Sequence, residues 1–323
     1  MHTGLKIAGV VVAPFLLVAL GTSLLRAFGV SDGPAAVAVG LAPFAALLYG
    51  VPLLWSIVAA ALSRRAGPLV IGGVSVLGLV AHGLWLMPFY VEDAPRYGDK
   101  LTVLTQNLEY GRADATALVR EITRAKVDVV AIQELTPDAV KALQAAGIHK
   151  VLKYSALAEE TGASGAGVWS RFPLSPGVQV PGMSFRSIST TITLPDGPLR
   201  FYAVHPFPPI PIGDNSRWQS DHVALAKALT VDRRKRVVVA GDFNATPDHP
   251  AMRALDELGY LDAADVAGAG VQPTWPLGRS YPPLFAIDHV LVTASLGVSS
   301  VSLVTVPGTD HRGVLASLVG GRA

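Results

Sequence analysis

Residues 237–244 read VVVAGDFN, so five small or β-branched apolar residues run directly into an aspartate and an asparagine. A short apolar run of this kind, bounded by turn-forming residues, is typical of a strand that is buried on both faces. Asp242 and Asn244 stand at the exit of this strand, and two residues apart in extended chain their side chains face the same way. The pattern favours a polar site at the strand end, with a simple Asx turn as the alternative interpretation.

Polar residues also mark the ends of other apolar runs in the C-terminal part of the chain. The runs LTVLTQ at 101–106 and VVAIQ at 129–133 end in this way, and DH pairs adjoin two later runs. The polar residues at these positions are Asn107, Glu134, His205, Asp288, Asp310 and His311. Because buried strands tend to end along one edge of a sheet, we expect these side chains to meet in one crevice.

The residue types in this set indicate a particular chemistry. Carboxylate and amide oxygens are hard ligands that suit Mg²⁺, with Mn²⁺ as the alternative and Zn²⁺ as a more distant one. Imidazoles can donate to phosphate oxygens or act as general acids. The set therefore predicts metal-assisted hydrolysis of a phosphate ester or anhydride. The chain contains no cysteine, which excludes disulfides, thiolate metal sites and a cysteine nucleophile.

Apolar or β-branched runs alternate with helical patterns from residue 101 onward. The predicted helices span 113–125, 137–146, 217–230 and 249–258. The predicted strands span 101–106, 127–132, 166–170, 187–194, 199–204, 236–240, 286–292, 299–305 and 313–319. Helices separated by many strands, several of them consecutive, predict an α/β fold in which two mixed sheets pack together with helices outside. We expect this four-layer α-β-β-α sandwich over residues 101–323.

Composition separates this region from the N-terminal part. Of the 323 residues, 50% are hydrophobic and 15% are charged, and the mean hydropathy is +0.43, which excludes an ordinary soluble enzyme. The apolar surplus lies in three uncharged runs, Ile7–Leu25, Gly33–Ser63 and Ala66–Val91. Each run is long enough to cross a hydrocarbon core of about 30 Å as a helix.

We therefore expect three transmembrane helices, at about 7–25, 36–60 and 68–90. They would form a membrane domain of residues 1–91, joined by a polar linker at 92–100 to the catalytic domain. The middle run contains glycine and proline but is too short for two spans, so one tilted or kinked helix is expected there.

Three spans with a cytoplasmic N-terminus place the C-terminal domain outside the cytoplasm, in a multi-pass protein of the cell membrane. A cleaved signal peptide is the alternative for the first run and gives the same location. The count of basic residues is tied, with Lys6, Arg64 and Arg65 inside and Arg26, Arg96 and Lys100 outside, and only the compact Arg64-Arg65 pair and the N-terminal amine favour this orientation. His82 lies in the third run, either as a functional group or as a residue that hydrogen-bonds a neighbouring helix.

Charge gives little indication of partners. Residues 100–323 contain 21 basic and 20 acidic residues, so this region has no overall charge that would attract nucleic acid. The run RRKR at 233–236 is interpreted as a solvated loop rather than a nucleic-acid patch. We expect no specific nucleic-acid partner, and the residues indicate no particular protein partner.

In their order, the motifs resemble those of the endonuclease/exonuclease/phosphatase superfamily, which has the deoxyribonuclease-I-like fold. The matching pieces are TQN at 105–107, QE at 133–134, VH at 204–205, GDFN at 241–244, IDH at 287–289 and TDH at 309–311. Thr309 departs from the usual serine of that family. The three apolar runs and the loop HPFPP at 205–209 are similar to a membrane-bound branch related to vancomycin- and teicoplanin-resistance proteins.

The resemblance implies a metal site. Glu134 would be the principal ligand of Mg²⁺, and Asn107 and Asp310 would complete the site or bridge to the metal. No organic cofactor is implied.

The resemblance also implies how the phosphate is attacked. Asp242 would orient or deprotonate the water, and Asn244 and His205 would hold phosphate oxygens. His311 would stabilise the pentacovalent phosphorus, and Asp288 would keep its imidazole charged and oriented. This pairing is physically reasonable, because an adjacent carboxylate raises the pKa of a histidine.

The loop after His205 is the main indication of substrate class. Residues 206–213 read PFPPIPIG, which is apolar but unable to pair as a strand because proline has no N–H. Near a membrane such a loop could admit a prenyl or acyl tail, although a rigid, partly buried loop is the alternative. Phe207, Arg217 and Trp275 are the candidate substrate contacts.

Three functions remain open from the residues. The leading one is a membrane-anchored phosphohydrolase for a lipid-linked phosphate, specifically a polyprenyl pyrophosphate of cell-envelope synthesis, in keeping with the antibiotic-resistance resemblance. The second is an anchored nuclease or phospholipid phosphodiesterase. The third is a non-catalytic envelope protein that binds lipid intermediates or glycopeptides. The complete set of proposed catalytic residues argues against this third function.

Overall fold

The computed structural model describes residues 2–93, 98, 100–233 and 235–320. The chain divides into two compact units. The first contains Met1–Pro88 with the short segments Ile210–Gly213 and Asp248–Pro250, and the second contains the remainder. Of the expected linker, residues 94–97 and 99 lie outside the described residues.

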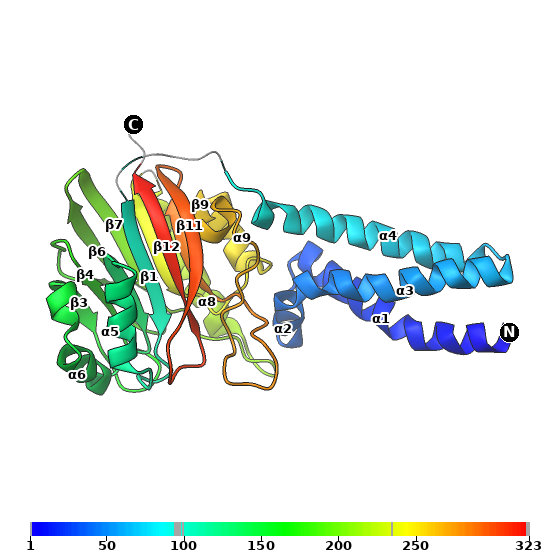
Figure 1. Cartoon of the computed structure of the whole chain (residues 1–323), viewed down its shortest axis with the longest axis horizontal. Helices are drawn as coiled ribbons and strands as arrows, with labels where there is room; N and C mark the ends of the chain where they lie inside the picture. The colour runs from blue at the N-terminus through cyan, green and yellow to red at the C-terminus, as the bar shows by residue number, and fades with distance from the viewer. Residues whose placement is uncertain (1, 94–97, 99, 234, 321–323) are drawn as a thin grey trace. The chain divides into compact units, whose positions relative to one another are not determined.

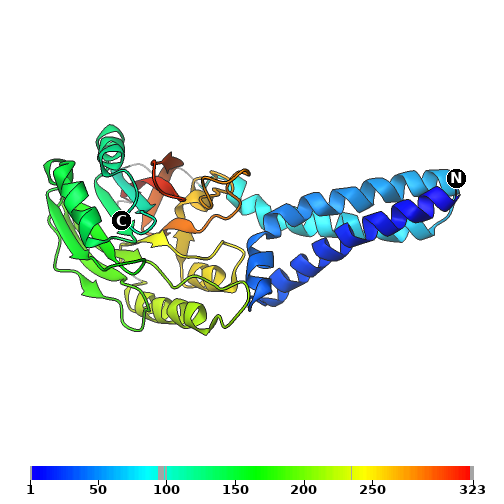
Figure 2. The ribbon, with the colours of Figure 1, turned by 90° about the horizontal axis from the view of Figure 1, so that it is seen from below.

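The first unit is built mainly from four helices. They are α1 (His2–Phe28), α2 (Pro34–Gly40), α3 (Ala42–Ser63) and α4 (Gly67–Leu86), and a 3₁₀ turn η1 (Met87–Tyr90) follows. Three segments are long and apolar enough to cross a membrane, namely Ala8–Phe28, Ala42–Ser63 and Gly67–Tyr90. Helices α1, α3 and α4 lie side by side, as Figure 2 shows. The prediction of three apolar helices of spanning length is confirmed.

The middle apolar run differs from the single helix expected at 36–60. The chain forms the short helix α2, turns at Leu41 and starts α3 at Ala42. Pro43 supplies the physical reason, because proline has no N–H to continue the hydrogen-bond ladder of α2 but is favourable in the first turn of a new helix.

A polar cluster joins the three long helices. Ser23 Oγ of α1 lies 2.9 Å from Tyr49 Oη of α3 and 2.9 Å from His82 Nε2 of α4. Tyr49 and His82 are each 1% exposed, so these hydrogen bonds are shielded. Gly78 makes room for Tyr49, because a Cβ atom at this glycine would lie 2.3 Å from the ring. His82 therefore hydrogen-bonds to a neighbouring helix, as one of its two interpretations required.

The second unit contains two six-stranded mixed sheets. Sheet A has the order β11-β12-β1-β2-β4-β3, and sheet B has the order β5-β6-β7-β8-β10-β9. The strands of sheet A are β1 (Lys100–Asn107), β2 (Val129–Gln133), β3 (Tyr154–Ala158), β4 (Ala166–Ser170), β11 (Leu296–Thr305) and β12 (Arg312–Gly320). Those of sheet B are β5 (Val178–Gln179), β6 (Ile188–Leu194), β7 (Gly197–Val204), β8 (Val237–Asp242), β9 (Tyr260–Asp262) and β10 (Asp288–Thr293). Figure 1 shows β1, β12 and β11 side by side.

Helices cover both outer faces of the sheets. The helices of this unit are α5 (Ala115–Arg124), α6 (Pro137–Ala145), α7 (Ile148–Val151), α8 (Ser216–Asp232), α9 (Pro250–Glu257) and α10 (Ala263–Val266), of which α10 contacts β10 and β11 and adds Ala263 to the core between the sheets. Val103, Phe201 and Val238 are fully buried between the sheets, and Leu104 of β1 and Leu118 of α5 are buried in the core between sheet A and helices α5 to α7. Figure 2 shows α8 and α5 on opposite sides of the sheets. The α/β sandwich with mixed sheets is therefore as predicted.

Each sheet contains a central parallel pair, β1 with β2 in sheet A and β7 with β8 in sheet B. Helix α5 lies in the first connection and α8 in the second. Because the strands of a parallel pair run in the same direction, their C-terminal ends lie at the same sheet edge. This topology determines where the polar strand-end residues lie.

Several short elements were not predicted. β5 has 2 residues and β9 has 3, which is too short for an alternating pattern to be recognised. β3 reads YSALA, and its edge position leaves most of its side chains partly or fully exposed. These strands are defined by their neighbours in the sheets rather than by their own residues.

Candidate active site

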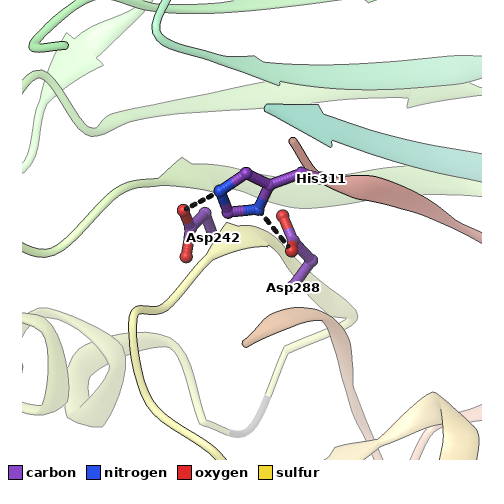
Figure 3. A group of neighbouring side chains, drawn as sticks. All are labelled: Asp242, Asp288 and His311. Carbon is purple, nitrogen blue, oxygen red and sulfur yellow. Dashed lines mark hydrogen bonds and ion pairs between the residues drawn. The ribbon is translucent and has the colours of Figure 1, made fainter. Parts of the chain in front are cut away.

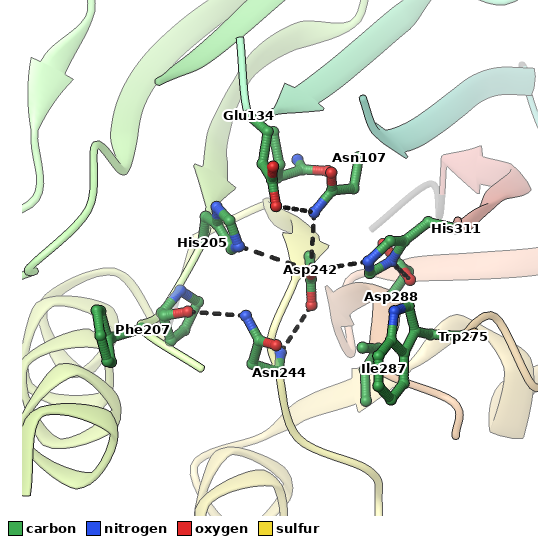
Figure 4. Close-up of polar contacts among 12 residues, drawn as sticks. Asn107, Glu134, His205, Phe207, Asp242, Asn244, Trp275, Ile287, Asp288 and His311 are labelled. Atoms are coloured by element: carbon green, nitrogen blue, oxygen red, sulfur yellow. Dashed lines mark hydrogen bonds and ion pairs between the residues drawn. The ribbon is translucent and has the colours of Figure 1, made fainter. Parts of the chain in front are cut away.

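The two parallel pairs bring four polar side chains together, as Figure 4 shows. Asn107 ends β1 and Glu134 follows β2, while His205 follows β7 and Asp242 ends β8. Asn107 Nδ2 donates to Glu134 Oε1 at 3.1 Å and to Asp242 Oδ2 at 3.0 Å. One amide therefore joins carboxylates that are supplied by different sheets.

Asp288 and His311 reach the same place from antiparallel strands. Asp288, the first residue of β10, is the register partner of Asp242. His311 directly precedes β12, and its Nδ1 lies 2.9 Å from Asp288 Oδ2. Its Nε2 lies 3.8 Å from Asp242 Oδ2 (Figure 3). The imidazole is thus buried between two carboxylates.

These buried groups shift one another's pKa. Burial, together with the charge of Asp288, raises the pKa of Asp242 to about 7. Burial alone would lower the pKa of His311, but Asp288 and Asp242 outweigh it and raise this pKa to about 10. At neutral pH His311 is therefore a cation with two donating nitrogens, and Asp242 is close to its midpoint for exchanging a proton.

His205 and Asn244 flank Asp242 (Figure 4). His205 Nε2 lies 3.6 Å from Asp242 Oδ2, and burial followed by the charge of His311 lowers the pKa of His205 to about 3. Asn244 has a left-handed backbone with φ 49°, and its N–H donates to Asp242 Oδ1 at 2.8 Å. Its Nδ2 donates to the Pro206 carbonyl at 3.1 Å. His205 therefore places a neutral imidazole, and Asn244 an uncharged amide, beside the Asp242 carboxylate.

Glu134 is held by a turn that the sequence analysis missed. Its Oε2 accepts a hydrogen bond of 2.6 Å from the Tyr110 N–H. Burial raises the pKa of Glu134, although this hydrogen bond and that from Asn107 oppose the shift. Glu109 and Tyr110 have φ of 47° and 56°, and Glu134 itself has φ 55°. Non-glycine residues rarely adopt this conformation, so the residue types gave almost no signal for the turn.

Asp310 contacts Trp275 and lies beside His311. Trp275 Nε1 donates to Asp310 Oδ2 at 2.9 Å, and Asp310 Oδ1 lies 3.7 Å from His311 Nε2. Thr309 donates its hydroxyl to the Asn107 carbonyl at 2.9 Å and accepts from the His311 N–H at 3.2 Å. The threonine therefore keeps a hydroxyl at the position of the usual serine and ties this turn to β1.

Phe207 and Arg217 lie next to one another. The guanidinium carbon of Arg217 is 3.9 Å from the centroid of the Phe207 ring. Phe185, which the sequence analysis did not single out, packs at 5.1 Å from both His205 and Phe207. The structure thus links the two proposed substrate contacts to His205 through a ring-to-ring contact.

The donor set fits a divalent cation. Four carboxylates, from Glu134, Asp242, Asp288 and Asp310, lie around the His311 cation. Asp242, Asp288 and His311 offer ligand atoms that lie within 4.8 Å of one another. Asp288 Oδ1 is buried and has no hydrogen-bond partner among the described residues. An excess of buried negative charge and an unpaired carboxylate oxygen are features that a bound cation would neutralise.

The sequence matches the model of the Endonuclease/Exonuclease/phosphatase family over residues 104–311. The match starts within β1 and ends at His311, so it contains every polar strand end described above. The chain belongs to this family. Members of the endonuclease/exonuclease/phosphatase family are hydrolases of the nuclease and phosphoesterase type.

Solved structures show the same family fold. An endonuclease/exonuclease/phosphatase from Beutenbergia cavernae DSM 12333 has a TM-score of 0.52 at 21% identity, over 71% of this chain and 73% of that chain. An AP endonuclease from Archaeoglobus fulgidus has a TM-score of 0.56 at 16% identity, over 67% and 98%. D. rerio TDP2 complexed with a single-strand DNA product has a TM-score of 0.51 at 15% identity, over 68% and 99%. A comparison with curated proteins finds no match.

Proposed function

We propose that this family member is a membrane-anchored phosphohydrolase that requires Mg²⁺, or Mn²⁺ in its place, and acts on a lipid-linked phosphate or pyrophosphate. The observation that carries the proposal is the position of His311 between Asp242 and Asp288, in a chain that also has three helices of membrane-spanning length. Our specific candidate substrate is a polyprenyl pyrophosphate of cell-envelope synthesis, hydrolysed outside the cytoplasm.

The side chains have distinct roles in this hydrolysis. Asp242 takes a proton from a water molecule as the water oxygen bonds to phosphorus and the bond to the leaving oxygen breaks. Protonated His311 donates to a non-bridging oxygen and stabilises the charge that develops in the transition state. Asp288 holds His311 in its charged form, and His205 and Asn244 hold the remaining phosphate oxygens.

Glu134, with Asn107 and Asp310, would hold the metal. A protonated His311 has no lone pair to offer a metal, which favours the oxygen donors over the Asp242–Asp288–His311 group. When bound, a divalent ion supplies positive charge that polarises the phosphate and neutralises its oxygens.

The lipid-linked substrate is supported by exposed apolar side chains in the loop after His205. Ile210 is 41% exposed and Ile212 is 88% exposed, which makes them available to a hydrocarbon tail. Phe207, Arg217 and Trp275 are the proposed contacts for the rest of the substrate. The resemblance to glycopeptide-resistance proteins extends the proposal to a role in resistance through lipid-intermediate turnover.

The test is phosphate release by the full chain in detergent micelles, with and without Mg²⁺. The substrates are a polyprenyl pyrophosphate, a short-chain analogue and duplex DNA, and the Phe207→Ser/Ile210→Ser double variant is compared with wild type. Burial contributes about 0.8 kcal/mol per CH₂, so a few sheltered methylenes should raise kcat/KM for the long chain by more than about tenfold. Equal rates on both chain lengths would remove the apolar loop from the proposal.

An anchored nuclease is the second candidate, because the AP endonuclease and the DNA complex of TDP2 share the fold. Part of the basic run is already paired, since Lys235 contacts Asp232 at 2.5 Å and Arg236 contacts Asp196 at 2.9 Å. Arg234 lies outside the described residues. Efficient, strongly salt-dependent DNA cleavage without lipid-phosphate turnover would replace the lipid proposal with this one.

A further inference from the structure

The carboxylate of Asp221 on α8 holds two segments, one that contains His205 and one that packs against it. The backbone N–H of Ser184 donates to Asp221 Oδ1 at 2.9 Å, and its hydroxyl donates to the same oxygen at 2.8 Å. The Phe207 N–H donates to Asp221 Oδ2 at 2.9 Å. Asp221 is 0% exposed, so protein groups rather than solvent satisfy both oxygens. One carboxylate therefore joins segments 184–187 and 205–207 to the same helix.

Segment 205–207 contains His205, and segment 184–187 contacts it directly. The His205 N–H donates to Ser187 Oγ at 3.0 Å, and the Phe185 ring packs against the imidazole. Phe185 in turn packs against Phe207. The donors to Asp221 are thus Ser184, which directly precedes Phe185, and Phe207 itself. They flank the packed rings of Phe185 and Phe207.

The same face of α8 also contacts the loop after β8, which contains Asn244. Trp218 lies three positions before Asp221, which places both side chains on one helix face. Trp218 Nε1 donates to the Asn244 carbonyl at 3.1 Å. The Asn244 amide reaches the Pro206 carbonyl at 3.1 Å, so the two loops are also tied to each other.

We propose that Asp221 is a positioning residue that fixes His205 relative to the scissile phosphate, an inference that rests on the proposed phosphohydrolase function. The site requires a group that only accepts, because all three of its partners donate. Asparagine would bring an NH₂ group against one of these donors and leave it unpaired in a buried place. Loss of the carboxylate should therefore release the two segments and misplace the imidazole.

Asp232 provides a matched control on the same helix. It is 5% exposed and accepts from Arg200 at 3.1 Å, Tyr202 at 2.6 Å and Lys235 at 2.5 Å. Asp232 is the last residue of α8. Its partners Arg200 and Tyr202 lie on β7, before the end of the strand that His205 follows. Asp232→Asn should thus cost stability, as Asp221→Asn does, without moving His205.

The experiment compares wild type, Asp221→Asn, Asp232→Asn, His205→Ala and the His205→Ala/Asp221→Asn double variant in detergent, with the phosphate substrates described above. Asp221→Asn should lower kcat by about tenfold to 100-fold with little change in KM, and Asp232→Asn should keep kcat within about twofold. In the His205→Ala background, Asp221→Asn should have almost no further effect. The same fold-loss in both backgrounds would show that Asp221 is merely structural and would overturn the proposal.

Hydrogen exchange separates this inference from the proposed function. Asp221→Asn should speed amide exchange in segments 184–187 and 205–207, whereas Asp232→Asn should leave these segments protected. If Asp221→Asn fails to fold, Ser184→Ala removes a single donor and should give a smaller change of the same sign. A wild type that hydrolyses no phosphate would refute the phosphohydrolase, while unchanged exchange in the Asp221 and Ser184 variants would refute the positioning role.

Discussion

Asp242 and Asp288 are register partners on the antiparallel strands β8 and β10, and both carboxylates face the imidazole of His311. The shorter contact, 2.9 Å, belongs to Asp288, and the longer one, 3.8 Å, to Asp242. The geometry therefore divides the roles of two similar groups. In the proposed mechanism, Asp288 stabilises the imidazolium and Asp242 accepts a proton from water.

The pH dependence of kcat/KM should be bell-shaped. In the proposed mechanism Asp242 acts when deprotonated, so activity should rise with pH through about 7, and His311 acts when protonated, so activity should fall through about 10. Asp288→Asn removes a charge that raises both pKa values, so both limbs should move to lower pH. Rate profiles of wild type and this variant measure the shift. Limbs that stay in place would contradict the assignment of either group.

The proton acceptor and the metal ligand should be separable by substitution. Asp242→Asn should keep the fold and most of the metal affinity but lower kcat by about 10² to 10⁴, because an amide cannot accept the proton of the water. Glu134→Ala and a chelator should each abolish hydrolysis, and Glu134→Ala should also weaken Mg²⁺ binding. Turnover and calorimetric Mg²⁺ titration distinguish the two effects. Indifference to chelation would exclude the metal-dependent mechanism.

The left-handed backbone of Asn244 allows two effects to be separated: the effect of backbone strain on stability and the effect of losing the side-chain amide on activity. Asn244→Gly removes the amide but accepts φ 49° freely, whereas Asn244→Ala removes the amide and pays about 1 kcal/mol for the same backbone. Both variants should lose activity, and the alanine variant should be the less stable. Thermal unfolding alongside turnover checks this order. An alanine variant as stable as the glycine variant would mean that the loop relaxes.

Gly78 should be more sensitive to substitution than Gly83 on the same helix. A Cβ at Gly78 would lie 2.3 Å from the Tyr49 ring, whereas nothing lies within 4 Å of a Cβ at Gly83. Gly78→Ala should therefore displace Tyr49 from Ser23 and lower the melting temperature, and Gly83→Ala should not. Thermal aggregation of the two variants in detergent provides the measurement. Similar melting curves would argue against the packing of α3 on α4.

The proposed orientation can be tested with a fused reporter. Three spans with a cytoplasmic N-terminus should make a phosphatase reporter at the C-terminus active, because such a reporter folds only outside the cytoplasm. A reporter that requires the cytoplasm should be inactive at the same position. The reverse result would move the hydrolase to the cytoplasmic face and exclude an external substrate.

The sequence was informative where structure depends on local patterning. The valine-rich run before Asp242 and the run LTVLTQ before Asn107 predict buried strands, and Asp242 and Asn107 are the last residues of these strands in the structure. Helix α6 begins at Pro137, the first residue of the helix predicted at 137–146, and the Thr136 side chain caps it. By contrast, Asp221 looks like any polar residue of a helix, since its partners lie 14 and 37 positions away.

The local rules also fail where the backbone is strained. Glu109 and Tyr110 have left-handed conformations that their side chains do not favour, so no residue pattern announces the turn that holds Glu134. The turn combines a local hydrogen bond, from the Glu109 N–H to Asn107 Oδ1 at 2.8 Å, with the hydrogen bond from the Tyr110 N–H to Glu134, which lies 24 positions away. Its recognition requires the folded arrangement of β1 and β2.

The pairing of β1 with β12 has a consequence for how the protein is made. Lys100 pairs with Val319 and Thr105 with Val314, so β1 and β12, the first and last strands along the chain, are neighbours in sheet A. A nascent chain that emerges N-terminus first must carry β1 with an open edge until β12 has been synthesised. Asn107 ends β1, which is synthesised first, and His311 directly precedes β12, which is synthesised last. The two residues can therefore come together only when β12 has paired with β1. The proposed active site can therefore assemble only after β12 has been synthesised.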